Sequence, residues 1–209
     1  MKGIICIGRQ YGSGGREVGE KLARKLGIPC YDKLLIKKAA LESGLSTDFI
    51  SKTEESPINS IQFLSGNPYA DIASIGNTFY SESQVTFNAE KEVIEKIAKQ
   101  GPCVIIGRCA DYVLREQPGV TSVFIYADMN IRIACLMERR RITRDEAITL
   151  IKKTDKSRRN YYECYTGKRW GAGTSYDVTL NSAELGLDTC VDLICSLYER
   201  KQEGDAQAR

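Results

Sequence analysis

The sequence predicts a single α/β domain in which a parallel sheet is covered by helices on both faces. Short and almost continuously apolar runs alternate with longer helical segments, as expected of buried parallel strands joined by helices. The first apolar run also leads through a glycine-rich turn into an amphipathic helix. The 209 residues suit one domain with a sizeable core.

The N-terminal segment contains the clearest unit of strand, turn and helix. Residues 3–9 read as a buried strand, and residues 10–15 are rich in turn-forming side chains. Apolar residues recur at helical spacing over 16–26, and Gly27 follows as a helix-ending residue. Residues 28–32 then read as a second strand.

The next stretch is helical at both ends and irregular in the middle. Residues 33–44 and 46–55 have helical patterns, the second with Ser or Thr at its start. Prolines and scattered Gly, Ser and Asn over 56–76 predict a loop or irregular structure. Residues 84–100 form an amphipathic helix that a Gly-Pro pair ends, and residues 103–108 read as another buried strand.

The C-terminal half repeats the alternation of strands and helices. The apolar run 120–128 predicts a strand, and 129–142 and 144–165 predict helices. After a loop, the expected order ends with a strand over 176–182 and a helix over 187–200.

Composition narrows the class of protein. The apolar run at the N-terminus stops at Arg9, too early for a signal peptide or a membrane span, so we expect a cytoplasmic protein with no membrane partner. Eight cysteines with no CxxC pair predict reduced, mostly buried thiols. The absence of histidine excludes histidine-based acid–base catalysis and histidine metal sites.

The glycine-rich turn has the chemistry of an anion cradle. Three glycines lie within four residues, where a tight turn can point successive N–H groups at a phosphate. The N-terminus of the following helix adds the positive end of its dipole. The expected phosphate-binding residues are Gly12, Ser13, Gly14, Gly15, Arg16 and Glu17.

This loop fits neither of two familiar glycine motifs completely. The sequence does not match the dinucleotide-binding motif GxGxxG, whether the motif is started at Gly12 or at Gly14. When GxxxxGK[ST] is aligned on Gly15, Arg16 takes the lysine position and Glu17 the hydroxyl position. We therefore expect Arg16 to be the phosphate-binding catalytic cation, and Ser13 or Glu17 to replace the missing magnesium ligand.

Positive charge is concentrated in one segment. The net charge of the chain is +3, but residues 132–169 alone contain twelve Lys or Arg and five Asp or Glu. A basic segment in a nearly neutral protein suggests contact with a polyanion. The interspersed acidic residues argue against a nucleic-acid partner.

Taken together, several segments resemble one known family. They are IICIGRQYGSGGREVGEKLARKLGIPCYDKLLI, CVIIGRCADYVL, RRNYYECYTGKRWG and YDVTLNS, and they are similar to the cytidylate-kinase-like family of P-loop proteins. The resemblance implies a P-loop NTPase three-layer sandwich with about five parallel strands and a helical lid. It also implies ATP and Mg²⁺ as cofactors, and nucleotide substrates, with phosphoryl transfer to CMP or dCMP as the leading activity.

The resemblance assigns residues to the acceptor side. Arg108 corresponds to an arginine that binds the acceptor phosphate, and Asp32 corresponds to an aspartate at the end of the second strand. Lys33 adds a cation beside it. Cys109 stands where the related kinases have an aspartate that binds the sugar, and Asp111 could replace that group.

The resemblance also makes the basic segment a lid over ATP. Arg132 corresponds to a position near the ATP base. We expect Arg139, with Arg158 or Arg159, to contact phosphates as catalytic residues, since neighbouring helical residues point about 100° apart. Tyr161, Tyr165 and Trp170 are expected to pack the lid rather than to stack on a base.

The whole chain is expected to be one P-loop kinase-like domain over 1–209. Residues 1–55 and 101–131 form its core, and 56–100 an acceptor-side helical insert. Residues 132–175 form the lid, and 176–200 the last strand and helix. Self-association stays open, as do two other functions: a kinase for another small acceptor, and a nucleotide-binding protein that has lost catalysis.

Overall fold

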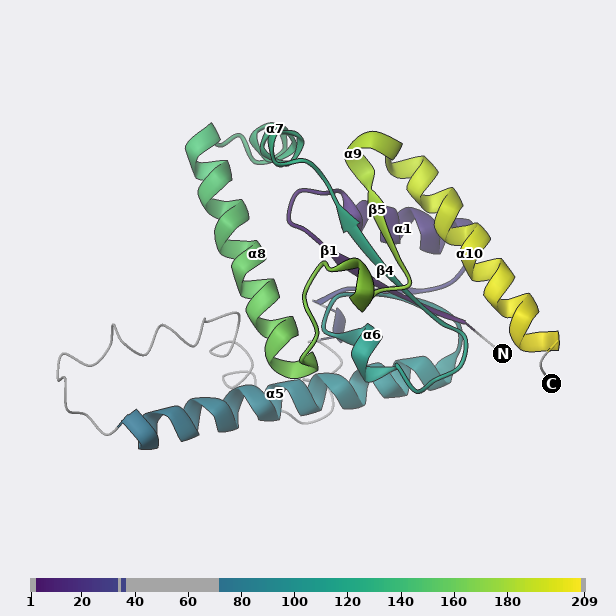
Figure 1. Ribbon diagram of the computed structural model, residues 1–209, viewed down its shortest axis with the longest axis horizontal. Coiled ribbons are helices and arrows are strands. Elements are labelled where there is room, and N and C mark those ends of the chain that lie inside the picture. Colours follow the sequence, from purple (N-terminus) through teal and green to yellow (C-terminus); the bar gives the residue numbers. More distant parts are fainter. Residues whose placement is uncertain (1–2, 34, 37–71, 208–209) are drawn as a thin grey trace.

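The predicted α/β fold is confirmed by one parallel sheet (Figure 1). The computed structural model describes residues 3–33, 35–36 and 72–207. Within these residues, five parallel strands run in the order β2-β3-β1-β4-β5. The strands are β1 (Ile4–Arg9), β2 (Cys30–Tyr31), β3 (Cys103–Ile106), β4 (Val120–Tyr126) and β5 (Val178–Asn181). Residues that follow the strands therefore meet at one edge of the sheet, where such folds bind ligands.

Helices connect these strands and cover the sheet on both faces. They are α1 (Gly15–Leu26), α5 (Ile72–Gln100), α6 (Ala110–Val113), α7 (Met129–Arg140), α8 (Arg144–Thr166), α9 (Ser182–Leu185) and α10 (Leu187–Gln207), with a 3-10 turn at η2 (Gly173–Ser175). Helices α1 and α10 pack on one face around Leu22 and Ile194. Helix α5 packs on the other around Ile94 and Leu114. Figure 1 shows α8 reaching past the sheet edge towards α5.

Helices α7 and α8 bring the basic segment against the glycine-rich loop. Thr143 and Glu146 form a reciprocal capping box that starts α8, a strong helix-initiating signal. The two helices pack through Leu136 and Ile151, and Tyr11 of the loop packs beside them. Asp128 caps α7 by accepting the N–H of Asn130 at 2.8 Å.

The structure corrects some boundaries. The prediction of irregular structure over 56–76 is wrong for residues 72–76, which are helical. Helix α5 begins at Ile72 and continues through the helix predicted over 84–100. The helix predicted over 46–55 and most of that over 33–44 lie outside the described residues. Helices α6 and α9 have four residues each, too few to produce a periodic sequence pattern.

Two expectations from composition can be compared with the structure. All eight cysteines are unpaired in the structure, and five of them are buried, in agreement with the predicted burial of most of these thiols. In the described part of the chain, no helix combines the length and apolar character needed to cross a bilayer.

Candidate active site

The glycine-rich loop turns at two left-handed glycines before α1. Gly12 and Gly14 have φ values of 81° and 72°, a backbone region that side-chain-bearing residues rarely adopt. Gly14 is the N-cap of α1, which begins at Gly15. The helix N-terminus with its positive dipole end therefore opens directly from the loop.

Ser13 connects the loop to the sheet through hydrogen bonds of its hydroxyl. Its side chain is 3% exposed, and its Oγ lies 2.9 Å from the Gln10 carbonyl and 3.1 Å from the Ile125 carbonyl. A hydroxyl held between two backbone carbonyls faces the protein interior, which does not favour the predicted role of Ser13 as a metal ligand. Its role is to hold the loop against β4.

Arg16 and Glu17, two other residues predicted for the donor side, form three ion pairs beside the loop. Arg16 contacts Glu20 through Nε at 2.8 Å and Asp32 through Nη2 at 3.0 Å, and its side chain is 63% exposed. Glu17 pairs with Arg139 of α7. The structure thus joins Arg16 to a residue predicted for the acceptor side, and Glu17 to one predicted for the lid.

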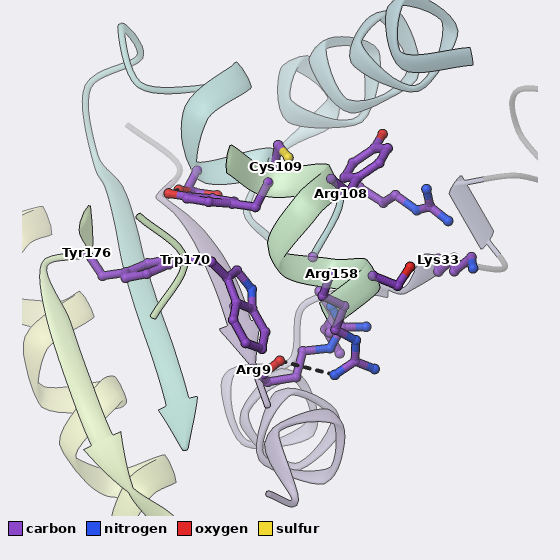
Figure 2. Close-up of a pocket in the computed structure, with 14 residues that line it drawn as sticks. Arg9, Lys33, Arg108, Cys109, Arg158, Trp170 and Tyr176 are labelled. Atoms are coloured by element: carbon purple, nitrogen blue, oxygen red, sulfur yellow. Dashed lines mark hydrogen bonds between the residues drawn. The ribbon is translucent and has the colours of Figure 1, made fainter. Parts of the chain in front are cut away.

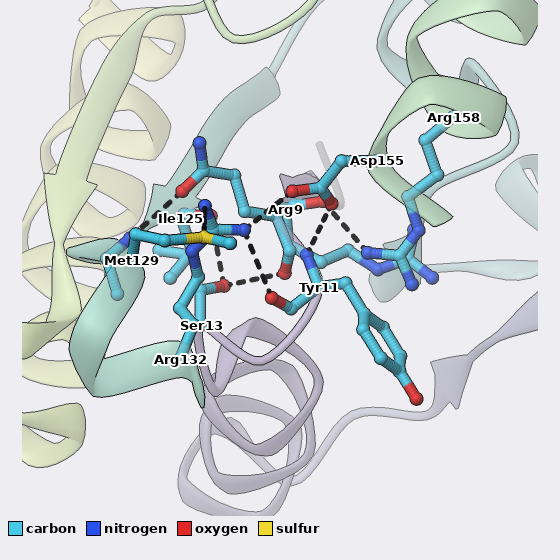
Figure 3. Close-up of polar contacts among 10 residues, drawn as sticks. Arg9, Tyr11, Ser13, Ile125, Met129, Arg132, Asp155 and Arg158 are labelled. Carbon is cyan, nitrogen blue, oxygen red and sulfur yellow. Dashed lines mark hydrogen bonds and ion pairs between the residues drawn. The ribbon is translucent and has the colours of Figure 1, made fainter. Parts of the chain in front are cut away.

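Arg132 is buried and contacts the backbone of the loop at Tyr11. Its Nη1 lies 2.6 Å from Oδ2 of Asp155 and 3.3 Å from the Tyr11 carbonyl. Asp155 in turn accepts the Tyr11 N–H at 2.7 Å, as Figure 3 shows. Burial and these partners do not favour the predicted contact of Arg132 with the ATP base. Arg132 ties α7 and α8 to the loop instead.

Beside the loop, four cationic side chains line a pocket at the carboxyl edge of the sheet. They are Arg9 at the end of β1, Lys33 after β2, Arg108 after β3 and Arg158 on α8. In Figure 2, Arg108 and Lys33 lie on one side and Trp170 and Tyr176 on the other. Arg9 was not among the residues predicted from the sequence, although it stands at the end of a predicted strand, where α/β folds bind ligands.

Arg108 is held in a strained and mostly buried position. Its Nη1 lies 3.1 Å from Oε1 of Glu90 on α5, and its guanidinium lies 5.3 Å from the Tyr161 ring centroid. Arg108 and Cys109 have φ values of 58° and 53°. Such backbone strain costs roughly 1–3 kcal/mol for each residue and concentrates at binding sites. The buried thiol of Cys109 has a raised pKa because of desolvation, so it stays protonated.

Aromatic side chains from the C-terminal half close the pocket. Tyr161, Tyr162, Trp170 and Tyr176 all line it. Each also contacts the protein: the Tyr161 hydroxyl donates to Glu90 at 2.6 Å, and Trp170 packs edge-on against Phe124. These contacts favour the packing role that was expected for Tyr161 and Trp170. Both rings also form part of the pocket wall.

Of the adjacent pair on α8, Arg158 is the one that faces the pocket. Its Nη1 donates to the Arg9 carbonyl at 3.1 Å, and its guanidinium lies 5.4 Å from the centroid of the Tyr11 ring. Arg159 is exposed and lies over Trp170. The sequence left open which of the two contacts a phosphate, and the lining of the pocket favours Arg158.

Asp111 lies deeper in the same pocket, with its Oδ2 accepting the Tyr162 hydroxyl at 2.7 Å. Burial raises the pKa of the Asp111 carboxyl above its ordinary value of 3.8. The folded state therefore binds the Asp111 proton more tightly than the unfolded state does. This contribution to stability is present at low pH and is lost as pH rises through the raised pKa.

Asp111→Asn should therefore stabilise the protein more at pH 7 than at pH 4, because asparagine keeps the hydrogen-bond acceptor without the buried charge. Chemical denaturation at a series of pH values measures the difference between variant and wild type. Asp188→Asn, which removes an exposed carboxylate, is the matched control. A difference that stays constant with pH contradicts the raised pKa.

The fold and this edge of the sheet define a P-loop kinase architecture. A solved protein of Eubacterium ventriosum, described as uncharacterized, is 28% identical with a TM-score of 0.72, and the match covers 95% of this chain and 99% of that one. Shikimate kinase from Bacteroides thetaiotaomicron is 15% identical with a TM-score of 0.51 over 95% and 99% of the two chains. At that identity the second likeness shows the fold alone.

The family follows from the sequence match. The chain belongs to the cytidylate kinase-like family, whose model matches residues 4–184. No curated protein matches the sequence significantly. The predicted family is thus confirmed, and family and fold together support a kinase of a nucleotide or other small molecule, with the nucleotide and Mg²⁺ use that such kinases have in general.

Proposed function

We propose that this protein transfers the γ-phosphoryl group of ATP to a nucleoside monophosphate, with CMP or dCMP as the leading acceptors. The observation that carries this proposal is the pocket beside the loop, which four cationic and four aromatic side chains line together. Arginine and lysine bind phosphate oxygens, and aromatic rings offer a surface for a planar base. One acceptor molecule with a phosphate and a base matches both features.

The residues of the chain act by positioning and by charge, which phosphoryl transfer requires more than a covalent nucleophile. The loop amides and the N-terminus of α1 bind the donor phosphates. Arg108 and Lys33 hold the acceptor phosphate, and Arg158 approaches from α8, between loop and pocket. Asp111 takes the acceptor sugar or base, in place of the aspartate that Cys109 replaces.

Two carboxylates near the loop, those of Glu17 and Asp32, are the ligands that we propose for Mg²⁺, and each now pairs with an arginine. Among the described residues, no cluster of three or more candidate ligands exists, but Mg²⁺ commonly takes one or two carboxylates and completes its shell with water and phosphate oxygens. Glu17 and Asp32 would supply those carboxylates. When bound, the ion would neutralise charge on the ATP phosphates.

Two other functions remain as competing proposals. The cysteine at position 109 favours a kinase for another small anionic acceptor, because the sugar-binding aspartate is missing. The loop without lysine or a free hydroxyl favours a nucleotide-binding protein without catalysis. We also propose that residues 1–209 act as one domain with a lid over 132–175, and that the protein works in the cytoplasm.

A coupled ADP-release assay over the common nucleoside monophosphates tests the proposal. We expect turnover with CMP or dCMP above the other acceptors, and Lys33→Gln should raise the acceptor KM about tenfold, since a charge-assisted hydrogen bond contributes roughly 1.5–3 kcal/mol. Lys21→Gln removes a lysine of the α1–α10 face and is the control. ATP binding without turnover on any nucleoside monophosphate would refute the proposal.

A further inference from the structure

In the glycine-rich loop, the last left-handed glycine, Gly14, is followed by Gly15 and not by a lysine. The structure places the side chain of Arg9 against Gly15. We propose that Arg9 supplies the positive charge to the transferred phosphoryl group that lysine supplies in the standard P-loop. This assignment rests on the proposed function and deepens it by naming a further catalytic residue, which sequence analysis did not identify.

The backbone of the loop shows how its residues align with those of the motif GxxxxGK[ST]. In GxxxxGK[ST] the lysine directly follows the second glycine, and that glycine ends the loop where the helix begins. Here the glycine that ends the loop is Gly14, the left-handed N-cap of α1. Gly15 then takes the lysine position, and Arg9 takes the position of the first motif glycine. Arg16 moves from the lysine position to the hydroxyl position.

Gly15 leaves space that the stem of Arg9 fills. A Cβ at Gly15 would lie 2.6 Å from the Cβ of Arg9 and 3.2 Å from its Cγ. No side chain fits at Gly15 while Arg9 stays in place. The side chain of Arg9 thus starts from the volume in which the side chain of a P-loop lysine would start.

A second glycine, far away in sequence, makes room for the charged end of Arg9. A Cβ at Gly107 would lie 2.1 Å from Nη1 of Arg9. The guanidinium therefore crosses the end of β3 and lines the pocket with Arg108 and Arg158. Figure 2 shows Arg9 and Arg158 beside each other, joined through the Arg9 carbonyl.

This position lies where the donor loop meets the acceptor pocket. In the transfer, an acceptor phosphate oxygen forms a bond to the γ-phosphorus of ATP. The bond from that phosphorus to the β–γ bridging oxygen breaks, and its electron pair leaves on ADP. A dianionic acceptor phosphate releases no proton. A guanidinium at this junction stabilises the charge on the γ-phosphoryl oxygens throughout. Arg16, by contrast, is directed at Glu20 and Asp32.

Arg9→Gln tests the assignment through binding and through turnover. Isothermal titration calorimetry with ATP and with ADP should show a loss of ATP affinity of about tenfold or more, because one charge-assisted contact is removed. The loss of ADP affinity should be smaller, since ADP lacks the γ-phosphate. In the ADP-release assay, kcat should fall by roughly 10²–10³-fold. Arg24→Gln, an exposed change in the last turn of α1, should behave as wild type.

A second variant tests the geometry while keeping the arginine. Gly15→Ala introduces a methyl group against Arg9 and should reproduce the selective loss of ATP affinity. Thermal unfolding midpoints show whether both variants fold, and Arg9→Lys, which keeps the charge, should recover part of the ATP affinity. Recovery by lysine supports a role of charge and excludes a general folding defect as the cause.

The outcomes for Arg9 and for the acceptor are separable. If the ATP affinity of Arg9→Gln falls no more than its ADP affinity, or if wild type does not prefer ATP to ADP, the assignment is overturned. If the selective loss occurs but no nucleoside monophosphate is phosphorylated, the assignment stands and the proposed acceptor class fails.

Discussion

Replacing Arg158 with alanine is expected to lower kcat by about 10³-fold or more, the range found when an arginine that stabilises a phosphoryl-transfer transition state is removed. Arg158 reaches from α8 into the pocket, and its Nη1 donates to the carbonyl of Arg9 at 3.1 Å. Because the charge of Arg158 is expected to stabilise the transition state more than bound ATP, its removal should change the KM for ATP much less than kcat. Steady-state kinetics with the best acceptor measure both values.

The matched control for this change is Lys156→Ala. Lys156 lies on the same helix two residues earlier and is exposed, so removing it takes one positive charge from α8 without changing the pocket. Arg158→Lys should keep only part of the activity, since lysine lacks the planar set of donors. A kcat within threefold of wild type for Arg158→Ala would place the catalytic charge elsewhere.

Replacing Asp155 with alanine is expected to lower the free energy of unfolding by about 3–5 kcal/mol, because a buried ion pair loses one partner. The Arg132 side chain is 9% exposed, so its charge would stay buried without its carboxylate. The Tyr11 N–H would lose its acceptor as well. Urea denaturation followed by circular dichroism measures the loss.

Two further variants separate the contributions of Asp155. Asp155→Asn keeps an acceptor for Tyr11 but removes the charge, and its loss should be smaller. The double variant Arg132→Met with Asp155→Leu removes both charges and should recover much of the stability, since buried pairs often exchange for apolar residues at little cost. Equal losses for all three variants would contradict a role of the unpaired Arg132 charge.

The fold was predictable from sequence because its strands are apolar runs and its helices are periodic. Strands at 3–9, 103–108 and 120–128 were found within two residues of their observed bounds at each end. Short elements such as α6 were not found, since four residues carry no period. The start of α5 at Ile72 was missed because Pro, Gly and Ser nearby suggested a loop.

The acceptor side of the candidate site was predictable through the resemblance to the cytidylate-kinase-like family. Arg108, Lys33 and Asp111 do converge on one pocket, because the carboxyl ends of parallel strands share an edge. Arg132 and Ser13 were assigned to ligands but are buried in contacts with the protein. A sequence shows that a side chain is polar, whereas its partners depend on which distant segments pack against it.

The sequence by itself determined the class of the fold and the family, and it predicted phosphate binding at the loop, because these depend on local patterns of glycine and apolar residues. Only the tertiary structure decided which cations face the pocket. Arg9 passes over Gly15 and Gly107, and these two glycines are 92 positions apart in the chain. The direction of a long side chain is set by the space that neighbouring segments leave, and that space exists only after the strands have come together.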